Sequence, residues 1–385
     1  MARFRDRPLG SIPEVFLTPP SASAYRASAT RARCNLHNHP AGAYRTRGAG
    51  VIWSPNDENM TEATHHRITC SEVARVVRCA AICREHSSIE ISIPHFSDSE
   101  PGQFLQLLCQ DGQDAAAAIH DWPPDGFPSI AGADFSGQRP YLRRPFSIAD
   151  RWMGSDGAVR LLVISRAIGV GTRWLAHLRP GDALNLTGPL GRGFSLPDPR
   201  TPVVLVGGGV GIPPLLYLAR RLWERGSDDV TAVFGATTGD LLPLKLIGEP
   251  ASDATATRCI LLPGDAPFPA LVTTDDGTMG RRGRVTDGLK AWYARRDGSK
   301  RPALVCACGP EGMLKTIAGM TRMLSLPCQL CIERNMACGV GTCLSCVVRR
   351  RDNRRPAGWS WALACADGPV FERDELLDYC GPQGA

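Results

Sequence analysis

The chain has 385 residues, 43% of them hydrophobic and 21% charged, so we expect two or three globular domains. The formal net charge of +6 is uneven, because residues 1–68 hold nine arginines and five acidic residues and the remainder is nearly neutral. A nearly neutral body argues against nucleic-acid binding over a broad basic face. The longest apolar stretch, Val203 to Ala219, contains four glycines and two prolines, so we expect no membrane span.

The cysteine content is high, with fifteen residues, nine of which lie from Cys306 onwards. A secreted disulfide framework is usually short and preceded by an apolar leader, and none follows Met1. We therefore expect a cytoplasmic protein whose thiols are reduced or bound to metal.

Residues 1–68 are rich in Arg, Ser, Ala, Pro and Gly and show no sustained periodicity. This composition predicts a disordered extension. A transit peptide is an alternative, although Asp6 and Glu14 weigh against it. A start of translation at Met60 is another, because the pattern changes soon after it.

Residues 69–199 contain several short, β-rich runs separated by turn signals, which predict a small antiparallel barrel. The segment at about 110–139 is rich in Gly, Pro, Asp and Ala and is expected to be an insertion. The runs that we expect to form strands are 73–79, 89–93, 104–109 and 161–164.

Residues 200–326 alternate apolar strands with helical stretches, which predicts a Rossmann-like α/β domain with a parallel sheet. The expected strands are 203–206, 230–234 and 303–306. Residues 327–385 form a cysteine-rich segment, which we expect to be a small separate domain. The fold class is thus multidomain α+β.

Four cysteines in the last segment have the spacing C-x4-C-x2-C-x18-C, which is typical of plant-type [2Fe–2S] sites. Gly339 and Gly341 allow the first loop to wrap closely around a cluster, because they adopt positive φ angles at low cost. Structural zinc is an alternative, with Cys328 and Cys331 as a second C-x2-C pair; buried free thiols are another. The predicted cluster ligands are Cys338, Cys343, Cys346 and Cys365.

An Arg-Pro-Phe-Ser run on an expected strand offers three contacts to a flavin dinucleotide. Arg144 can pair with the pyrophosphate, Phe146 can pack on the cofactor, and Ser147 can bond the ring edge near N5. Pro145 lies between them. Alone, the six residues 143–148 that contain this run are weak evidence for such a site.

A second run, Ile164-Ser165-Arg166, precedes a glycine turn that opens a short helix. Gly171 and Thr172 stand at the start of that helix, where free N–H groups and the helix dipole favour an anion. We expect the flavin pyrophosphate to lie there.

Two further turns follow apolar strands and open helices, at the sheet edge where nucleotides bind. The first contains Gly207, Gly208, Gly209 and Gly211, although Pro213 breaks the strict G-x-G-x-x-G form and a plain structural turn is an alternative. The second is Cys308-Gly309-Pro310, which can border a nicotinamide ring. A covalent role for the Cys308 thiol is the rival interpretation, and no histidine lies nearby in sequence.

The order of these motifs resembles the ferredoxin-reductase superfamily, over about residues 72–375. Within it, the chain most resembles the electron-transfer subunits of two-protein, NAD-linked dihydroorotate dehydrogenase. The most specific parts are the run 333–346, which contains three of the four cysteines, and the run from Cys365 to Phe371.

The resemblance implies FAD on the barrel segments, NAD on the glycine turns and a [2Fe–2S] cluster on the four cysteines. It also implies a partner subunit that carries FMN and oxidises dihydroorotate to orotate in pyrimidine synthesis, in a heterotetramer with two copies of each chain. The segment 235–240 contains no Arg for a 2′-phosphate, which favours NAD over NADP.

Other functions remain open from sequence. An electron-transfer subunit of a sulfide dehydrogenase or hydrogenase has the same motifs, and so does a free-standing oxygenase reductase. An interaction module that is stabilised by zinc is a third alternative.

Overall fold

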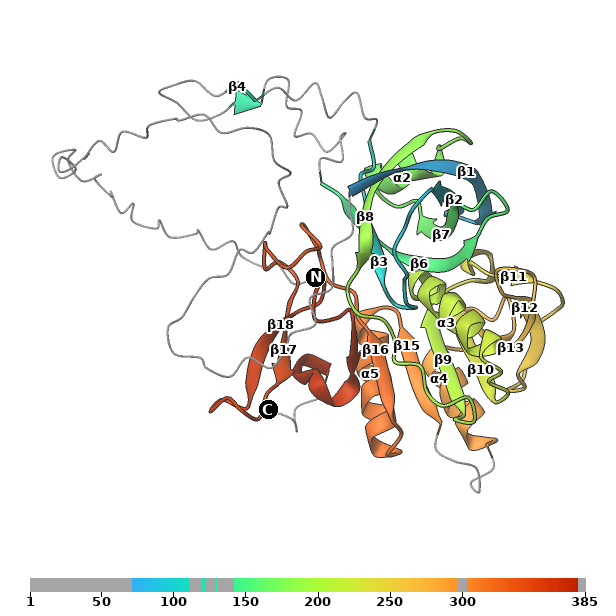
Figure 1. The fold of residues 1–385 in the computed structure, drawn as a ribbon. Helices are drawn as coiled ribbons and strands as arrows, with labels where there is room; N and C mark the ends of the chain where they lie inside the picture. Colours follow the sequence, from blue (N-terminus) through green and yellow to red (C-terminus); the bar gives the residue numbers. More distant parts are fainter. Residues whose placement is uncertain (1–70, 111–119, 122–128, 131–141, 297–302, 380–385) are drawn as a thin grey trace, which may run out of the picture. The chain divides into compact units, whose positions relative to one another are not determined.

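The computed structural model describes residues 71–110, 120–121, 129–130, 142–296 and 303–379 (Figure 1). The expected extension at 1–68, the proposed start at Met60 and most of the expected insertion lie outside these ranges. No helix within them is both long enough and apolar enough to cross a membrane.

The first part is a closed antiparallel barrel of six strands in the order β1-β2-β7-β6-β3-β8. Burial alternates along β2 and β7, as expected for strands with one face toward a core. The helix α2 (Val170–Ala176) follows β7, and β4 (His120–Asp121) pairs separately with β5 (Ser129–Ile130). The barrel strands are β1 (Ser71–Cys83), β2 (His86–Ile93), β3 (Phe104–Leu107), β6 (Arg144–Met153), β7 (Val159–Arg166) and β8 (Ala183–Leu190).

The second part is a nine-stranded sheet with the main order β11-β12-β13-β10-β9-β15-β16-β19. The five central strands from β13 to β16 run parallel, and β14 pairs in parallel with β13. The strands are β9 (Val203–Gly208), β10 (Val230–Ala236), β11 (Lys245–Leu246), β12 (Thr257–Leu261), β13 (Pro267–Thr274), β14 (Arg281–Arg282), β15 (Leu304–Cys308), β16 (Cys328–Cys331) and β19 (Val370–Glu372).

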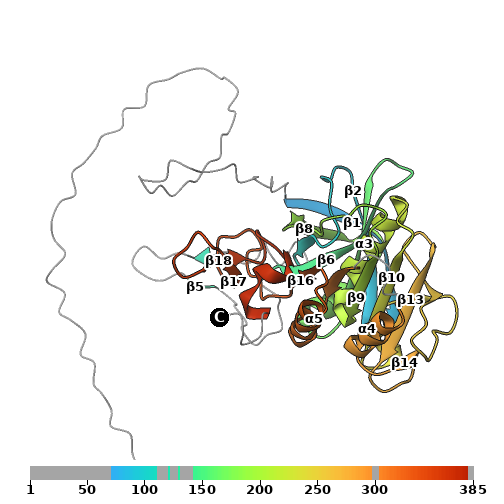
Figure 2. The same ribbon diagram turned by 90° about the horizontal axis from the view of Figure 1, so that it is seen from below.

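Helices cover both faces of this sheet (Figures 1 and 2). The helix α3 (Ile212–Glu224) packs on one face, and α4 (Val285–Ala294) and α5 (Glu311–Met323) pack on the other. Every residue of β9 is buried, because both sides of the strand are covered. Single 3₁₀ turns complete the chain: η1 (Gly209–Gly211), η2 (Gly239–Leu241), η3 (Arg373–Glu375) and η4 (Leu377–Tyr379).

The C-terminal segment contains a hairpin of β17 (Val347–Arg351) and β18 (Trp359–Leu363). Two other strands of this segment, β16 and β19, extend the large sheet instead. The expected boundary between residues 326 and 327 therefore falls just before a strand that pairs with β15. The predicted fold class of barrel, Rossmann-like sheet and small cysteine-rich domain is confirmed.

The barrel and the sheet meet where α3 packs on β6. Asp150 of β6 is fully buried, and its carboxylate accepts a hydrogen bond from Arg220 of α3, which also pairs with Glu224. Burial raises the pKa of Asp150 to about 6, although the nearby Arg220 opposes this shift. Because this pKa is higher than the usual 3.8, the contribution of Asp150 to stability is full below about pH 4 and declines as the pH rises through about 6.

The variant Arg220→Met is expected to destabilise the fold, because it leaves a buried carboxylate without its cation. Breaking such a pair costs roughly 3–5 kcal/mol. The loss should be larger at pH 8, where the carboxyl is ionised, than at pH 5, where it is mostly protonated. Thermal unfolding at both pH values measures it, with the more exposed Arg221→Met as the control. An equal loss in the control, or a larger loss at pH 5, would contradict this account.

Candidate functional site

A large cavity has a volume of about 680 Å³, which is sufficient for a drug-sized ligand or part of a dinucleotide. All three parts of the chain contribute to its lining. Phe146 and Ser147 come from the barrel, Cys308 from the end of β15, and Met336 from the segment before the cysteine cluster.

Eight of the predicted cofactor residues line this cavity. The barrel side of its wall is formed by the antiparallel strands β6 and β7 and by residues that follow β7. Ser165 is only 3% exposed and its hydroxyl has no hydrogen-bond partner. A buried hydroxyl without a partner is the group that a ligand would satisfy. The eight residues are Pro145, Phe146, Ser147, Ile164, Ser165, Arg166, Thr172 and Cys308.

Three neighbouring predicted residues make contacts within their own segment of the chain. Arg144 does not line the cavity, and its guanidinium donates to the carbonyls of Leu142 and Arg143. The Thr172 hydroxyl accepts from the Gly169 amide at 2.9 Å and so helps to hold the turn before α2. Gly171 is buried within that helix.

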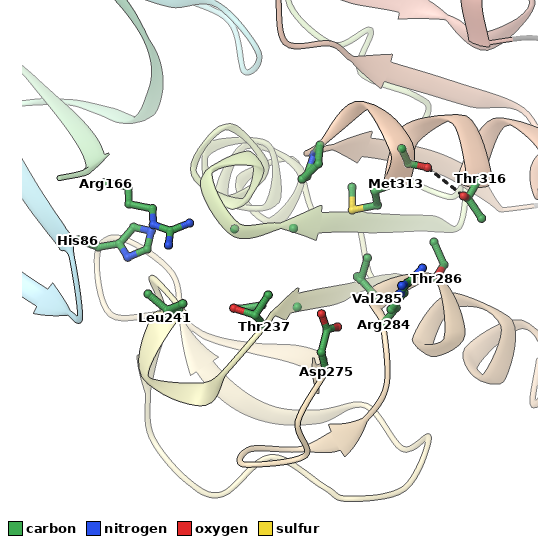
Figure 3. A pocket seen from close by; sticks show the side chains of 16 residues that line it. His86, Arg166, Thr237, Leu241, Asp275, Arg284, Val285, Thr286, Met313 and Thr316 are labelled. Carbon is green, nitrogen blue, oxygen red and sulfur yellow. Dashed lines mark hydrogen bonds between the residues drawn. The ribbon is translucent and has the colours of Figure 1, made fainter. Parts of the chain in front are cut away.

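A second cavity of about 400 Å³ lies at the carboxyl edge of the parallel sheet (Figure 3). The predicted Gly208, Gly209 and Pro310 line it, and so does Arg166, which is therefore common to both cavities. The lining also contains residues that we did not predict from sequence. They are His86, Thr237, Asp275, Arg284, Thr286 and Met313.

The other glycines of the two turns stand where a side chain would meet neighbouring atoms. A Cβ atom on Gly211 would lie 2.2 Å from the carbonyl oxygen of Cys308, so only glycine fits there. A Cβ on Gly207 would lie 3.0 Å from Leu215 and from Phe234. Gly309 has a φ of 155°, and a Cβ atom there would lie 2.5 Å from the Met313 side chain. These positions hold the two turns side by side at the cavity edge.

Cys308 lies beside Cys331 in the paired register of β15 and β16, and both thiols line the large cavity. Its hydrogen bond with Cys331, together with burial, holds the pKa of Cys308 well above its usual range. A thiol with a raised pKa is a poor nucleophile, which argues against a covalent role for Cys308.

The loop of the first two predicted cluster ligands wraps around one sulfur atom. The backbone amides of Val340 and Cys343 each point at Cys338 Sγ, at 3.4 Å. Gly339 and Gly341 have φ angles of 74° and 86°, which the tight loop requires. N–H groups directed at sulfur are the donors that an iron–sulfur cluster needs.

The other predicted cluster ligands differ in burial and in pKa. Burial and then a hydrogen bond with Cys346 raise the pKa of Cys365 to about 12, while the Gly341 amide lowers it. Cys343 is exposed, and hydrogen bonds from Ser345 lower its pKa to about 6. One ligand thus faces solvent, and two are buried.

In the described ranges, no three His, Cys, Asp or Glu side chains are placed to hold a single metal ion. A [2Fe–2S] cluster has a different requirement, since each of its irons takes only two thiolates. The four thiols and the amides around Cys338 fit that requirement. Cys328 and Cys331, the pair considered for zinc, lie in a strand of the large sheet.

The cavity also contains a run that sequence reasoning did not assign to a site. Glu333, Arg334, Asn335 and Met336 line it between β16 and the cluster loop. Arg334 pairs with Glu311 at the start of α5, at 3.1 Å. The signal was present, because this run begins the most specific part of the family resemblance.

Family models match two segments of the chain. The one described as iron-sulfur cluster binding domain of dihydroorotate dehydrogenase B matches residues 333–377. The one described as oxidoreductase NAD-binding domain matches residues 205–319. The first segment includes the four cluster cysteines, and the second includes the lining of the second cavity except for His86 and Arg166.

A solved structure and curated relatives agree with the two family models. A chain of the NADH-dependent reduced ferredoxin-NADP oxidoreductase, described for flavin-based electron bifurcation, has a TM-score of 0.57 and 25% identity, covering 80% of this chain and 91% of that chain.

Two curated relatives carry the name dihydroorotate dehydrogenase B (NAD(+)), electron transfer subunit. The protein from Caldanaerobacter subterraneus subsp. tengcongensis is 30% identical over 72% of this chain and 87% of its own. The protein from Geobacillus kaustophilus is 35% identical over 72% of this chain and 90% of its own. The chain therefore belongs to the family of electron transfer subunits of dihydroorotate dehydrogenase B.

Proposed function

We propose that this chain carries electrons between NAD and the FMN-containing catalytic subunit of a dihydroorotate dehydrogenase B, in de novo pyrimidine (UMP) biosynthesis. Its own cofactors would be FAD and a [2Fe–2S] cluster. One observation carries the proposal: a single cavity touches the barrel strand, the end of the nucleotide-type sheet and the segment that leads to the cluster cysteines.

The residues around the cavity have separate tasks. When bound, FAD exchanges a hydride with nicotinamide and single electrons with the cluster. Phe146 and Ser147 would hold the flavin, and the buried Ser165 hydroxyl would donate to it. Cys308 and Gly309 would border the nicotinamide. The task of the chain is to position these groups, and no acid or base is required of it.

The site of the four predicted cluster cysteines would pass electrons to the partner. Cys343 is exposed, and its neighbour Leu344 is 60% exposed with a φ of 58°. Bulky residues avoid that conformation, so the backbone at Leu344 is strained. The strained turn exposes an apolar side chain to solvent. Trp361 of the adjacent hairpin is 62% exposed. We propose that the catalytic partner subunit docks on this face, defined by Leu344, Val347 and Trp361.

The relatives' name implies a catalytic partner, and we propose two copies of each chain in the assembly. This stoichiometry rests on the family resemblance. We also propose a cytoplasmic location, since none of the twelve cysteines in the described ranges forms a disulfide.

The second cavity bears on the choice between NAD and NADP. Asp275 follows β13 and lines the cavity near Thr237 (Figure 3), where an acidic side chain can accept from a ribose 2′-hydroxyl. The segment 235–240 that we considered from sequence has no arginine, but Arg284 reaches the same cavity from the start of α4. We propose that the Asp275 carboxylate excludes a 2′-phosphate.

Replacing Cys365 with serine should separate the two electron-transfer steps. We expect Cys365→Ser to keep flavin reduction by NADH, because the cavity is intact, and to lose reduction of the partner. Stopped-flow absorbance of the flavin and assays with the catalytic subunit measure the two steps. The control Cys328→Ser removes a buried thiol outside the cluster. Partner reduction that survives in Cys365→Ser would overturn the scheme.

Replacing Asp275 should weaken the preference for NADH. We expect Asp275→Asn to reduce the ratio of kcat/KM for NADH to that for NADPH about tenfold, which corresponds to about 1.4 kcal/mol. Steady-state reduction of an artificial acceptor measures both values. The neighbouring Asp276→Asn, which does not line the cavity, should leave the ratio unchanged. An unchanged ratio in Asp275→Asn would count against the assignment.

Removing the exposed tryptophan should weaken the partner complex. We expect Trp361→Ala to lower the amount of catalytic subunit that co-purifies, at least tenfold, because exposed aromatic residues often dominate interfaces. Flavin reduction by NADH should not change. Met323→Ala, an 81% exposed residue at the end of α5, is the matched control. Equal loss in both variants, or in neither, would exclude this face as the interface.

A further inference from the structure

Gln106 of β3 is fully buried, yet neither polar atom of its side chain has a hydrogen-bond partner. In the part of the chain that the structure describes, it is the only residue with two such atoms. Leaving a buried polar group unpaired costs about 1–3 kcal/mol, so an unpaired amide calls for an explanation.

The side chain of Gln106 points away from the barrel interior. Leu105 and Leu107 belong to the barrel core, so alternation along the strand directs Phe104 and Gln106 to the opposite face. Phe104 belongs to a different core cluster, which also contains Cys346 and Cys365. Gln106 therefore faces the cysteine segment.

The contact on that side is with the cluster loop itself. A Cβ atom on Gly339 would lie 2.6 Å from both Cγ and Nε2 of Gln106. Gly339 directly follows the predicted ligand Cys338, and its φ is 74°. The Gln106 amide thus lies against the loop that wraps around the Cys338 sulfur, at a position where any larger residue than glycine would displace it.

The backbone of Gln106 contacts the residues around the start of β6. It pairs opposite Pro145 of β6, and the guanidinium of Arg143 donates to its carbonyl at 3.3 Å. Pro145 and the two residues after it line the large cavity. Gln106 therefore connects the strand that borders the large cavity with the loop of the predicted cluster ligands.

We propose that Gln106 is a positioning residue of the cluster. Its side-chain amide donates a hydrogen bond to sulfur at the 338–339 turn, and this bond raises the reduction potential of the cluster. The inference rests on the proposed function. A donor directed at sulfur stabilises the more negative, reduced form of the cluster, and hydrogen bonds of this kind are an established means of setting its potential. The cluster would in turn satisfy the buried amide.

The test compares two buried glutamines of the same segment by redox titration of the purified protein, with the cluster followed by electron paramagnetic resonance. Gln106→Met keeps the length of the side chain and removes the donor. We expect the equilibrium between reduced and oxidised cluster to shift about tenfold toward the oxidised form, which for one electron is about 59 mV. The flavin potential should stay the same.

Gln103→Met is the control, because its amide is satisfied by Gly191 and by the Glu100 backbone. That variant should lower the thermal midpoint and leave the cluster potential unchanged, whereas Gln106→Met should not lower the midpoint of the protein without its cluster. If Gln106→Met fails to load the cluster, Gln106→Glu, which has the same shape and a negative charge, provides the comparison and should shift the potential further down.

An unchanged cluster potential in the Gln106 variants, or an equal shift in Gln103→Met, would overturn the inference. Failure of the proposed function has a different appearance, since the wild-type protein itself would then lack the cluster signal or fail to reduce the partner.

Discussion

The antiparallel pairing of β19 with β16 is the interaction on which the rest of the arrangement depends. It adds a second strand of the cysteine segment, beside β16, to the edge of a sheet whose other strands belong to the nucleotide-type domain. The residues before β19 reach the barrel part as well, because the Arg192 amide, which follows β8, donates to the Gly368 carbonyl. The Ile332 amide after β16 donates to the Pro369 carbonyl. All three parts of the chain are therefore joined by backbone hydrogen bonds within a few residues.

This junction places the site. The large cavity lies where the barrel, the end of β15 and the run after β16 come together, and Pro369 is part of its wall. Close backbone contacts leave no room for side chains at several points, as at Gly191, where a Cβ atom would lie 2.6 Å from the Gly368 oxygen. Electron transfer between cofactors depends on short, fixed separations, and a junction built from backbone satisfies that need without long flexible side chains.

Much of the architecture could be predicted because it depends on local patterns. Alternating burial in β2 and β7 and the fully apolar β9 follow directly from residue type. The role of Cys328 and Cys331 was less accessible, because two cysteines at C-x2-C spacing fit buried thiols on a strand and also half of a zinc site. Their assignment to a strand depends on β15, a neighbour that is more than twenty residues away in sequence.

The sequence by itself determined the cluster spacing, the glycine turns and the order of the three parts, because these reside in short runs whose chemistry requires particular residues. Only the tertiary structure revealed that Asp275 and Arg284 share a cavity, that Met336 lies with Phe146, and that the unpaired Gln106 amide meets Gly339. Gln106 and Gly339 are separated by more than two hundred residues, and neither belongs to a periodic pattern that points to the other. Contacts of that kind follow from the closure of the barrel and the pairing of β19, so the chain must fold before they exist.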